Sequence, residues 1–375
     1  MRFPEFDGEW EIHRLGELVE IKSGVSPTGI IDENGLFPFY KVEQLNNCYV
    51  ELNETPYLTM QSSVPVHSII FPKRGAAIMT NKIRIASKPC QLDTNLMALI
   101  IENNEKVDYK FLFYFIARYN LSKIADTSTI PQINNIHINP LKITLPSIKE
   151  QQKISALLTV LDLKIDTQRK IIEKYESLIR GISNKLLYAD NGIPVRLGDI
   201  LLERSERTKV NNQHEVLSST VKGIFSQREY FSKDIASENN VGYKIIRLHD
   251  VVLSPQNLWM GNINYNDKFD IGIVSPSYKI FSIAEGYDKR FASALLKTHR
   301  ALYNYMQVSE QGASVVRRNL NMEAFEQLVF KIPRYTTQCE IGRILDSMQK
   351  SLGIAISTQS HLEQQKQWLL RNLFI

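Results

Sequence analysis

Apolar residues recur at alternating spacings of four and three along two long segments of the chain. In the first segment the positions with this spacing are Ile154, Leu158, Leu161, Ile165, Gln168, Ile172, Tyr175, Ile179, Ile182 and Leu186. In the second segment they are Ile341, Leu345, Met348, Leu352, Ala355, Gln359, Leu362, Lys366, Leu369 and Leu373. Charged residues such as Asp162, Lys164, Asp166 and Lys170 fall between these positions. A heptad repeat with a charged exterior predicts two long coiled-coil helices.

Each predicted helix follows a segment of mixed pattern, and the two mixed segments begin alike. Arg14-Leu15-Gly16-Glu17-Leu18 returns as Arg196-Leu197-Gly198-Asp199-Ile200, and Leu145-Pro146 before the first helix returns as Ile332-Pro333 before the second. Asn191-Gly192 and Pro194 end the first helix, because Gly accepts a left-handed cap and Pro cannot continue a helix. The predicted parts are a globular domain at 1–146, a helix at 147–190, a second globular domain at 191–333 and a helix at 334–375. This order predicts a pseudo-two-fold internal repeat.

Within the globular segments, short apolar runs alternate with longer periodic ones. The short runs predict strands at 68–71, 76–79, 251–253 and 277–283, and the longer ones predict helices at 109–119 and 290–305. Only the borders of the two segments clearly resemble each other in sequence. The expected fold class is therefore α+β, with two globular domains separated by two long antiparallel coiled-coil helices.

The helices can pair parallel or antiparallel, and the inverted symmetry needed to return the chain favours the antiparallel arrangement. If Ile154 faces Leu373, then Gln168 falls opposite Gln359, and each is the only Gln in its apolar row. A mutual hydrogen bond between these two side chains would fix the register, whereas a Gln opposite a Leu leaves donors unmet at roughly 1–3 kcal/mol.

In this register Leu161 faces Lys366, whose methylene stem covers the leucine while its ammonium reaches water. A helix over residues 154–186 is about 50 Å long, from a rise of about 1.5 Å per residue.

Composition limits the classes of function. The chain is 43% hydrophobic, which is enough to bury ordinary cores, and its net charge of +5 suits a polyanionic partner without requiring one. Cys48, Cys90 and Cys339 are odd in number and far apart, and neither a signal segment nor an apolar run of about 18 residues occurs. We therefore expect a cytoplasmic protein that does not enter a membrane.

Motifs for catalysis or metal binding are absent from the sequence. There is no phosphate-binding Gly-Lys-Ser/Thr loop and no pair of Cys or His at zinc spacing. Asn139-Pro140 continues with Leu141-Lys142 rather than as an Asn-Pro-Pro-Tyr-like segment. We expect no catalytic residue, no metal site and no cofactor in this chain.

The duplicated order resembles the specificity subunit of a type I restriction-modification system, and the resemblance covers the whole length. The residues that match are the two copies of the pentapeptide, Ser23-Gly24, Phe71-Pro72-Lys73-Arg74-Gly75, Ile271-Gly272-Ile273-Val274-Ser275-Pro276-Ser277-Tyr278, and Gln151 and Gln338 after the two prolines. The resemblance implies a non-catalytic subunit that binds an asymmetric, bipartite double-stranded DNA target, with one half-site for each target-recognition domain.

The resemblance also implies the partners. They are two methyltransferase subunits, which the outer faces of the long helices would dock, and two restriction subunits that act as motor and nuclease. S-adenosylmethionine, ATP and Mg²⁺ would be bound by these partners. One turn of B-DNA measures about 34–36 Å, so helices of this length can hold two domains over half-sites about one turn apart.

Candidate DNA-binding residues are cations for phosphates and amides for base edges. In the first globular segment they are Lys73, Arg74, Asn81, Lys82 and Arg84, and in the second they are Gln256, Asn257, Asn262, Arg317 and Arg318, with Trp259 and Asn264 beside them. The alternative interpretations are an exposed charged turn, an Asn-rich loop and a solvated pair of arginines.

Two other functions remain open from the residues alone. One is a coiled-coil interaction scaffold without a role in DNA binding. The other is a Mg²⁺-dependent nuclease, because Asp7, Glu20 and Lys22 satisfy a loose acid, acid-x-Lys spacing. The second copy has Leu202 and Arg204 where Glu20 and Lys22 would map, so an ordinary strand is the favoured interpretation of these residues.

The register generates a direct test. Cysteines placed at Gln168 and Gln359 should crosslink under mild oxidation, because antiparallel pairing brings the two positions together. The measurement is the mobility of the oxidised chain on a denaturing gel. Efficient crosslinks in a parallel register, with none at this pair, would contradict the prediction.

Overall fold

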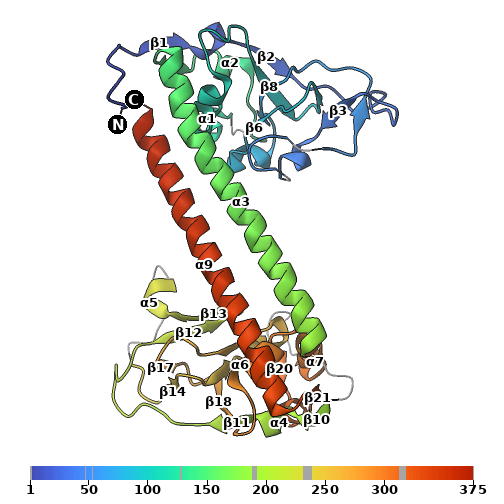
Figure 1. Ribbon diagram of the computed structural model, residues 1–375, viewed down its shortest axis with the longest axis vertical. Helices are drawn as coiled ribbons and strands as arrows, with labels where there is room; N and C mark the ends of the chain where they lie inside the picture. The colour runs from blue at the N-terminus through green and yellow to red at the C-terminus, as the bar shows by residue number, and fades with distance from the viewer. Residues whose placement is uncertain are drawn as a thin grey trace. The chain divides into compact units, whose positions relative to one another are not determined.

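The computed structural model describes residues 2–46, 48–52, 54–126, 129–187, 192–230, 239–311 and 318–374 (Figure 1). The chain divides into two compact units. Unit 1 contains Met1–Ile171 and Ile356–Ile375, and unit 2 contains Ile172–Ala355. Each unit therefore consists of one globular part together with a portion of each long helix.

The two long helices are α3, Ile148–Leu186, and α9, Tyr335–Leu373, of 39 residues each. Every position of the predicted apolar rows is buried or half-buried, including Gln168 and Gln359. The periodicity therefore predicted correctly which side of each helix packs. Together with the mixed globular parts, these helices confirm the α+β fold class.

In unit 1 a four-stranded antiparallel sheet has the order β2-β8-β5-β6. A smaller sheet, β4-β3-β7, pairs β3 with β7 in parallel, and β1 pairs with β9 before the chain enters α3. The elements are β1 Glu11–Arg14, η1 Leu15–Glu17, β2 Val19–Ser23, β3 Phe37–Tyr40, η2 Val42–Asn46, β4 Leu58–Thr59, β5 Ile69–Pro72, η3 Ala76–Thr80, β6 Arg84–Ile85, β7 Gln91–Leu92, β8 Leu96–Ile101, α1 Tyr109–Tyr119, η4 Leu121–Ile124, α2 Asn135–Ile138 and β9 Lys142–Leu145.

In unit 2 the four-stranded sheet has the order β11-β18-β15-β16, and β10 pairs with β21 before the chain enters α9. The elements are β10 Ile193–Arg196, α4 Leu197–Ile200, β11 Leu201–Arg204, β12 Leu217–Thr220, β13 Gly223–Ser226, α5 Gln227–Tyr230, β14 Lys244–Arg247, β15 Val251–Leu253, η5 Pro255–Met260, β16 Ile263–Tyr265, β17 Ile271–Val274, β18 Lys279–Ile283, α6 Lys289–Leu296, α7 His299–Gln307, β19 Ser309–Gln311, β20 Arg318–Leu320, α8 Met322–Glu326 and β21 Val329–Ile332.

The repeat extends into the interior of both units, although only their borders resemble each other in sequence. β2, β8, β5 and β6 occupy the same places in their sheet as β11, β18, β15 and β16 in theirs, and a 3-10 helix follows β5 just as one follows β15. The smaller pairings differ, because β3 and β7 are parallel whereas β14 and β17 are antiparallel. The two units are therefore related by duplication but are not copies in detail.

The local predictions were correct for some segments and wrong for others. Helix α1 and strand β15 have the predicted bounds. The predicted strand at 76–79 is wrong, since η3 begins after Gly75 at φ +83° and ends at Asn81 at φ +46°, and these angles turn the chain. The predicted helix at 290–305 is two helices, because the Thr298 hydroxyl accepts a hydrogen bond from Ala301 N at 3.2 Å and starts α7.

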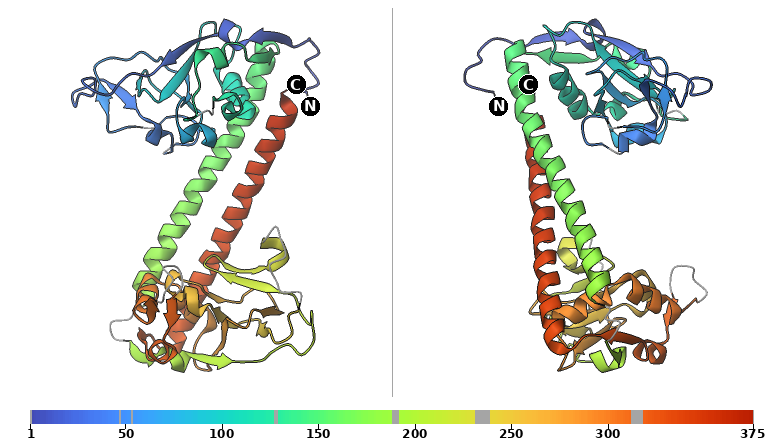
Figure 2. Two further views of the ribbon diagram at one scale, coloured as in Figure 1. Left: turned by 180° about the vertical axis from the view of Figure 1, so that it is seen from behind. Right: turned by 45° about the vertical axis from the view of Figure 1, so that its right-hand side comes forward.

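Each unit has its own core, and the long helices contribute to both. In unit 1 the start of α3 packs on the end of α9 (Figure 2). The ring centroid of Phe374 lies 4.9 Å from that of Phe111. In unit 2 the end of α3, with Leu187, shares a core with Ile341 and Leu345 at the start of α9. The pairing is therefore antiparallel within each unit, as predicted.

A buried glutamine attaches the start of each long helix to its globular part. Gln151 Nε2 donates to Pro146 O at 2.9 Å and to Lys106 O at 3.0 Å, and Gln151 Oε1 accepts from Asp108 N at 2.9 Å. Asp108 is the N-cap of α1. We call this arrangement a glutamine bridge.

The second glutamine bridge has the same pattern. Gln338 Nε2 donates to Pro333 O at 2.9 Å, and Gln338 Oε1 accepts from Asp288 N at 3.2 Å. Asp288 is the N-cap of α6. Both glutamines are almost fully buried. The two glutamines that carry part of the family resemblance thus hold equivalent positions in the fold.

A buried ion pair joins the two long helices in unit 1. Lys366 Nζ lies 2.5 Å from Asp162 Oδ1, and Tyr114 OH donates to Asp162 Oδ2 at 2.7 Å. Burial and the Asp162 charge together raise the pKa of Tyr114. The sequence predicted that the Lys366 ammonium reaches water; it meets the Asp162 carboxylate instead, which corrects that part of the prediction.

The predicted contact between Gln168 and Gln359 stays a prediction. Gln359 Nε2 donates to Glu363 Oε1 at 2.7 Å along its own helix. The Asp162–Lys366 pair is the polar contact that defines the register here.

Replacing Lys366 by Met should lower the free energy of unfolding by about 3–5 kcal/mol, because it leaves the Asp162 charge buried without its partner. Adding Asp162→Asn should restore most of the loss. The control is Lys350→Met, which breaks the exposed pair with Asp346 and should cost at most about 1 kcal/mol. Urea unfolding followed by circular dichroism measures all three, and equal losses at Lys366 and Lys350 would contradict the prediction.

Candidate nucleic-acid interface

In unit 1 the predicted cations Lys73 and Arg74 lie in a loop between β5 and η3 whose backbone is fixed on both sides. Lys73 N donates to Asn95 O at 2.8 Å, and Lys73 O accepts from Ile133 N at 2.8 Å. Gly75 N donates to Pro131 O at 2.8 Å. Arg74 is exposed and Lys73 is half-buried. A loop with a fixed backbone that presents one exposed and one half-buried cation is suited to hold a phosphate.

The next predicted residues of unit 1 are occupied by contacts within the protein. Asn81 Nδ2 donates to Ala117 O at 2.9 Å and so attaches the end of η3 to α1. The Lys82 ammonium donates to the side-chain oxygen of Asn46, and Arg84 Nη1 donates to Ile83 O at 2.7 Å. These three side chains are half-buried. The structure therefore offers Lys73 and Arg74 more freely than it offers these residues.

In unit 2 the predicted Asn-rich loop is not a loop. Gln256 and Asn257 lie on η5, where Gln256 is exposed and Asn257 half-buried. Asn262 and Asn264 are 5% and 4% exposed. Asn262 Oδ1 accepts from Ser219 Oγ at 2.9 Å, and Asn262 Nδ2 donates to Ser219 O at 3.0 Å. This buried amide thus joins the residue before β16 to β12, and its predicted DNA contact stays a prediction.

Arg318 and Trp259 form a cation–π contact between β20 and η5. The Arg318 guanidinium carbon lies 4.4 Å from the centroid of the Trp259 ring. Arg318 Nε and Trp259 Nε1 are both buried without a hydrogen-bond partner. Arg317 lies outside the described residues. Of the predicted residues in this unit, Arg318 thus lies against the ring of Trp259.

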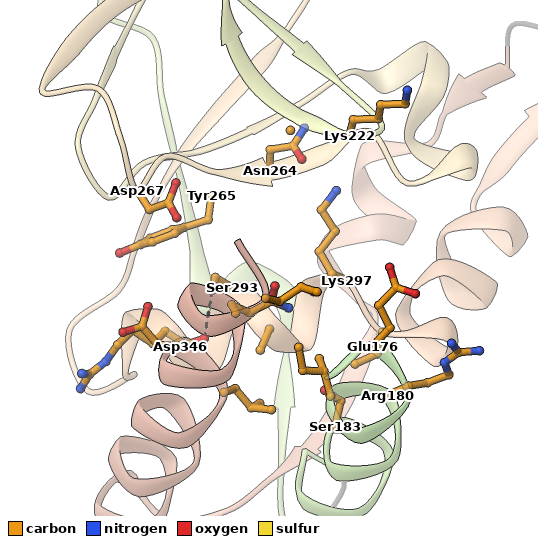
Figure 3. Close-up of a pocket in the computed structure, with 18 of the residues that line it drawn as sticks. Glu176, Arg180, Ser183, Lys222, Asn264, Tyr265, Asp267, Ser293, Lys297 and Asp346 are labelled. Atoms are coloured by element: carbon orange, nitrogen blue, oxygen red, sulfur yellow. Dashed lines mark hydrogen bonds between the residues drawn. The ribbon is translucent and has the colours of Figure 1, made fainter. Parts of the chain in front are cut away.

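A pocket in unit 2 has residues that the sequence did not single out (Figure 3). Its volume is about 710 Å³, and its walls come from α3, the β12–β13 turn, β16, α6 and α9. Lys297, at the end of α6, extends into it. No signal in the sequence indicates this pocket, because its walls come from segments that are far apart along the chain.

Glu20 and Lys22, the residues of the nuclease alternative, lie two residues apart on the same strand, β2. Lys22 Nζ lies 3.9 Å from Glu20 Oε1, and both side chains are about half exposed. Among the described residues, no group of three or more His, Cys, Asp or Glu side chains could hold a metal ion. None of the described helices is long and apolar enough to cross a membrane.

Comparison with known proteins finds similar sequences for the first part of the chain. Residues 7–177 match the family model of the type I restriction modification DNA specificity domain. The MjaVIII specificity subunit of a type I restriction enzyme from Methanocaldococcus jannaschii is 28% identical over 200 residues, which cover 49% of this chain and 46% of that protein. The MjaIX specificity subunit from the same organism is 27% identical over 182 residues, which cover 44% of this chain and 41% of that protein. The match thus spans less than half the length of these curated relatives.

Solved structures share the fold over the whole chain. The S subunit of a type I restriction-modification system from M. genitalium aligns with a TM-score of 0.66 and 15% identity, covering 100% of this chain and 97% of that one. A chain from a study of complex assembly and conformational transition of the type I system aligns with a TM-score of 0.52 and 13% identity, covering 99% and 98%. At these identities the likeness concerns the fold.

These findings define the class of protein. It is a duplicated α+β protein with two long helices, and it shares its fold with the S subunits. The predicted resemblance to a type I restriction-modification specificity subunit is confirmed, in sequence over residues 7–177 and in fold over the whole chain. The relatives are named specificity subunits, which agrees with the prediction that this chain is a recognition subunit rather than an enzyme.

Proposed function

We propose that this chain is the DNA sequence-specificity subunit of a type I restriction-modification complex. It binds an asymmetric, bipartite double-stranded DNA target, and each unit reads one half-site. The observation that carries the proposal is the repeated sheet order in two units of unlike detail, within a chain that matches the specificity domain over residues 7–177. Because the two units differ in their smaller sheets and surface residues, their half-sites differ too.

The exposed cations support DNA as the ligand. Lys73 and Arg74 on their fixed loop would contact phosphates, and Gln256 with Arg318 would contact the other half-site. Contacts of this kind release counterions, so binding to a duplex depends steeply on salt. A coiled-coil scaffold without a DNA role would show no such binding, which separates that alternative from the proposal.

Two methyltransferase and two restriction subunits complete the proposed complex, which works in the cytoplasm. Those partners bind S-adenosylmethionine, ATP and Mg²⁺. The long helices set the distance between half-sites and provide the docking faces for the methyltransferases. In α3, Leu157, Val160 and Leu163 lie outside the apolar row and are 38%, 52% and 63% exposed. Apolar side chains so exposed on one helix suit the burial of a partner helix.

Exchanging residues 25–130 for the corresponding segment of a relative should change one half of the methylated sequence and leave the other half unchanged. The reason is that this segment forms most of the globular part of unit 1 and none of unit 2. Sequencing that maps methylated bases across the host genome measures both halves. A change in both halves would contradict independent reading, and methylation that does not depend on the chain would contradict the proposed function.

Replacing Leu163 by Glu should weaken binding of the methyltransferase subunit by at least about tenfold, because it places a charge in a surface that the partner buries. Lys174→Gln is the control, since Lys174 is an exposed α3 residue and its change shifts the net charge equally. Co-purification and calorimetric titration measure the association. Equal binding by the two variants would contradict docking at Leu163.

A further inference from the structure

The pocket of unit 2 surrounds one lysine with polar and charged side chains. In Figure 3, Lys297 extends from the end of α6 toward the open centre, between Lys222 of the β12–β13 turn and Glu176 of α3. Small-molecule pockets of this size are lined mainly by apolar and aromatic groups. The walls of this pocket, of about 710 Å³, combine apolar groups with several charged side chains. Its lining is suited to a charged, hydrated ligand.

Positive charge is in excess in the pocket. The cations along its walls besides Lys297 are Arg180, Lys222, Lys268 and Arg290, and His299 lies among them. Arg290 is already paired with Asp288 at 3.2 Å. Lys297, Lys222, Lys268 and Arg180 therefore remain to contact a ligand.

The carboxylates of the pocket do not balance these cations. They are Glu176, Asp267 and Asp346, and Asp346 is paired with Lys350 at 2.9 Å. Two carboxylates thus face the four remaining cations. An excess of this sign attracts an anion.

Lys297 itself is held by neutral acceptors. Its ammonium donates to Gly261 O at 3.0 Å and lies 3.5 Å from Val221 O. No carboxylate among the described residues forms an ion pair with it. The residue as a whole is exposed, yet burial of its ammonium lowers the pKa of Lys297 to about 8. An ammonium with three donors and no counter-charge is positioned to bind an anion.

We propose that Lys297 binds a phosphate of the DNA backbone within this pocket, beside Lys222 and Arg180. The proposal rests on the proposed function and names a phosphate contact outside the predicted DNA-binding residues. Both long helices line the pocket, together with the β12–β13 turn and β16. A phosphate bound here would therefore contact the helices and the globular part of unit 2 at once.

The charge of Lys297 makes the contact sensitive to pH. Its pKa of about 8 means that the free protein carries this charge at neutral pH and loses it as the pH rises through that value. DNA affinity should therefore fall between about pH 7 and about pH 9. Arginine stays charged over this range, so Lys297→Arg should remove this part of the pH dependence.

The experiment measures binding of the full chain to a fluorescein-labelled mixed-sequence duplex by anisotropy, from about 50 to 200 mM salt. At neutral pH, Lys297→Met should bind about tenfold more weakly, as expected for loss of a hydrogen bond to a charged group. Its slope of log affinity against log salt should be smaller by about 0.9, the contribution of one phosphate. The control Lys331→Met removes an exposed lysine outside the pocket and should leave the slope unchanged.

The outcomes are distinguishable. If Lys297→Met binds the duplex with the wild-type affinity and slope, the proposal for Lys297 is wrong while the proposed function stands. If the wild-type chain does not bind a duplex, the proposed function itself fails. Titration with inorganic phosphate tests the other source of the same chemistry. Phosphate binding that Lys297→Met abolishes, with an unchanged DNA slope, would show a small-anion site and overturn the proposal.

Discussion

The glutamine bridges are the contacts on which the arrangement of each unit depends. Each long helix begins after a proline, and one buried carboxamide ties that proline's carbonyl to the N-cap of the helix that follows the sheet. A carboxamide can donate and accept at the same time, whereas a carboxylate lacks the donor and an apolar side chain lacks both. Gln151 and Gln338 therefore attach the start of each long helix to its globular part.

Around this shared contact the two units have diverged. Ser155 Oγ donates to Asp108 Oδ1 at 2.6 Å in unit 1, whereas at the equivalent Gly342 of unit 2 a Cβ would lie 2.3 Å from Asp288 Oδ1. The second helix thus approaches its N-cap too closely for any side chain. The ion pair between Asp162 and Lys366 belongs to unit 1 alone, since Gln349 and Ile179 occupy the equivalent positions. A duplicated fold whose two units differ in detail suits the asymmetric DNA target that we propose.

The sequence predicted well those parts of the fold that follow from periodicity. It predicted less well the parts that depend on contacts between segments far apart along the chain. The seven-residue pattern specified the buried side of both helices, and α1 followed from its apolar run. The strand expected at 76–79 failed because apolar residues in a short run do not reveal the backbone angles at Gly75 and Asn81. The burial of Asn262 could not be predicted for a related reason: its partner, Ser219, lies on β12, which is distant along the chain.

The same limit explains why the sequence pointed to Lys73 and Arg74 while the pocket of Lys297 went unnoticed. Cations that are adjacent in the sequence, such as Lys73 and Arg74, can be recognised from the sequence alone. This pocket is instead assembled from both long helices, a turn and the end of α6. The two kinds of contact have different consequences. A phosphate bound by the loop of Lys73 and Arg74 would position that loop, whereas a phosphate bound at Lys297, as proposed, would position the sheet of unit 2 against its portions of the long helices. Base contacts can discriminate between sequences only after that orientation is fixed. The base contacts that specify a sequence therefore depend on phosphate contacts, which carry no sequence information.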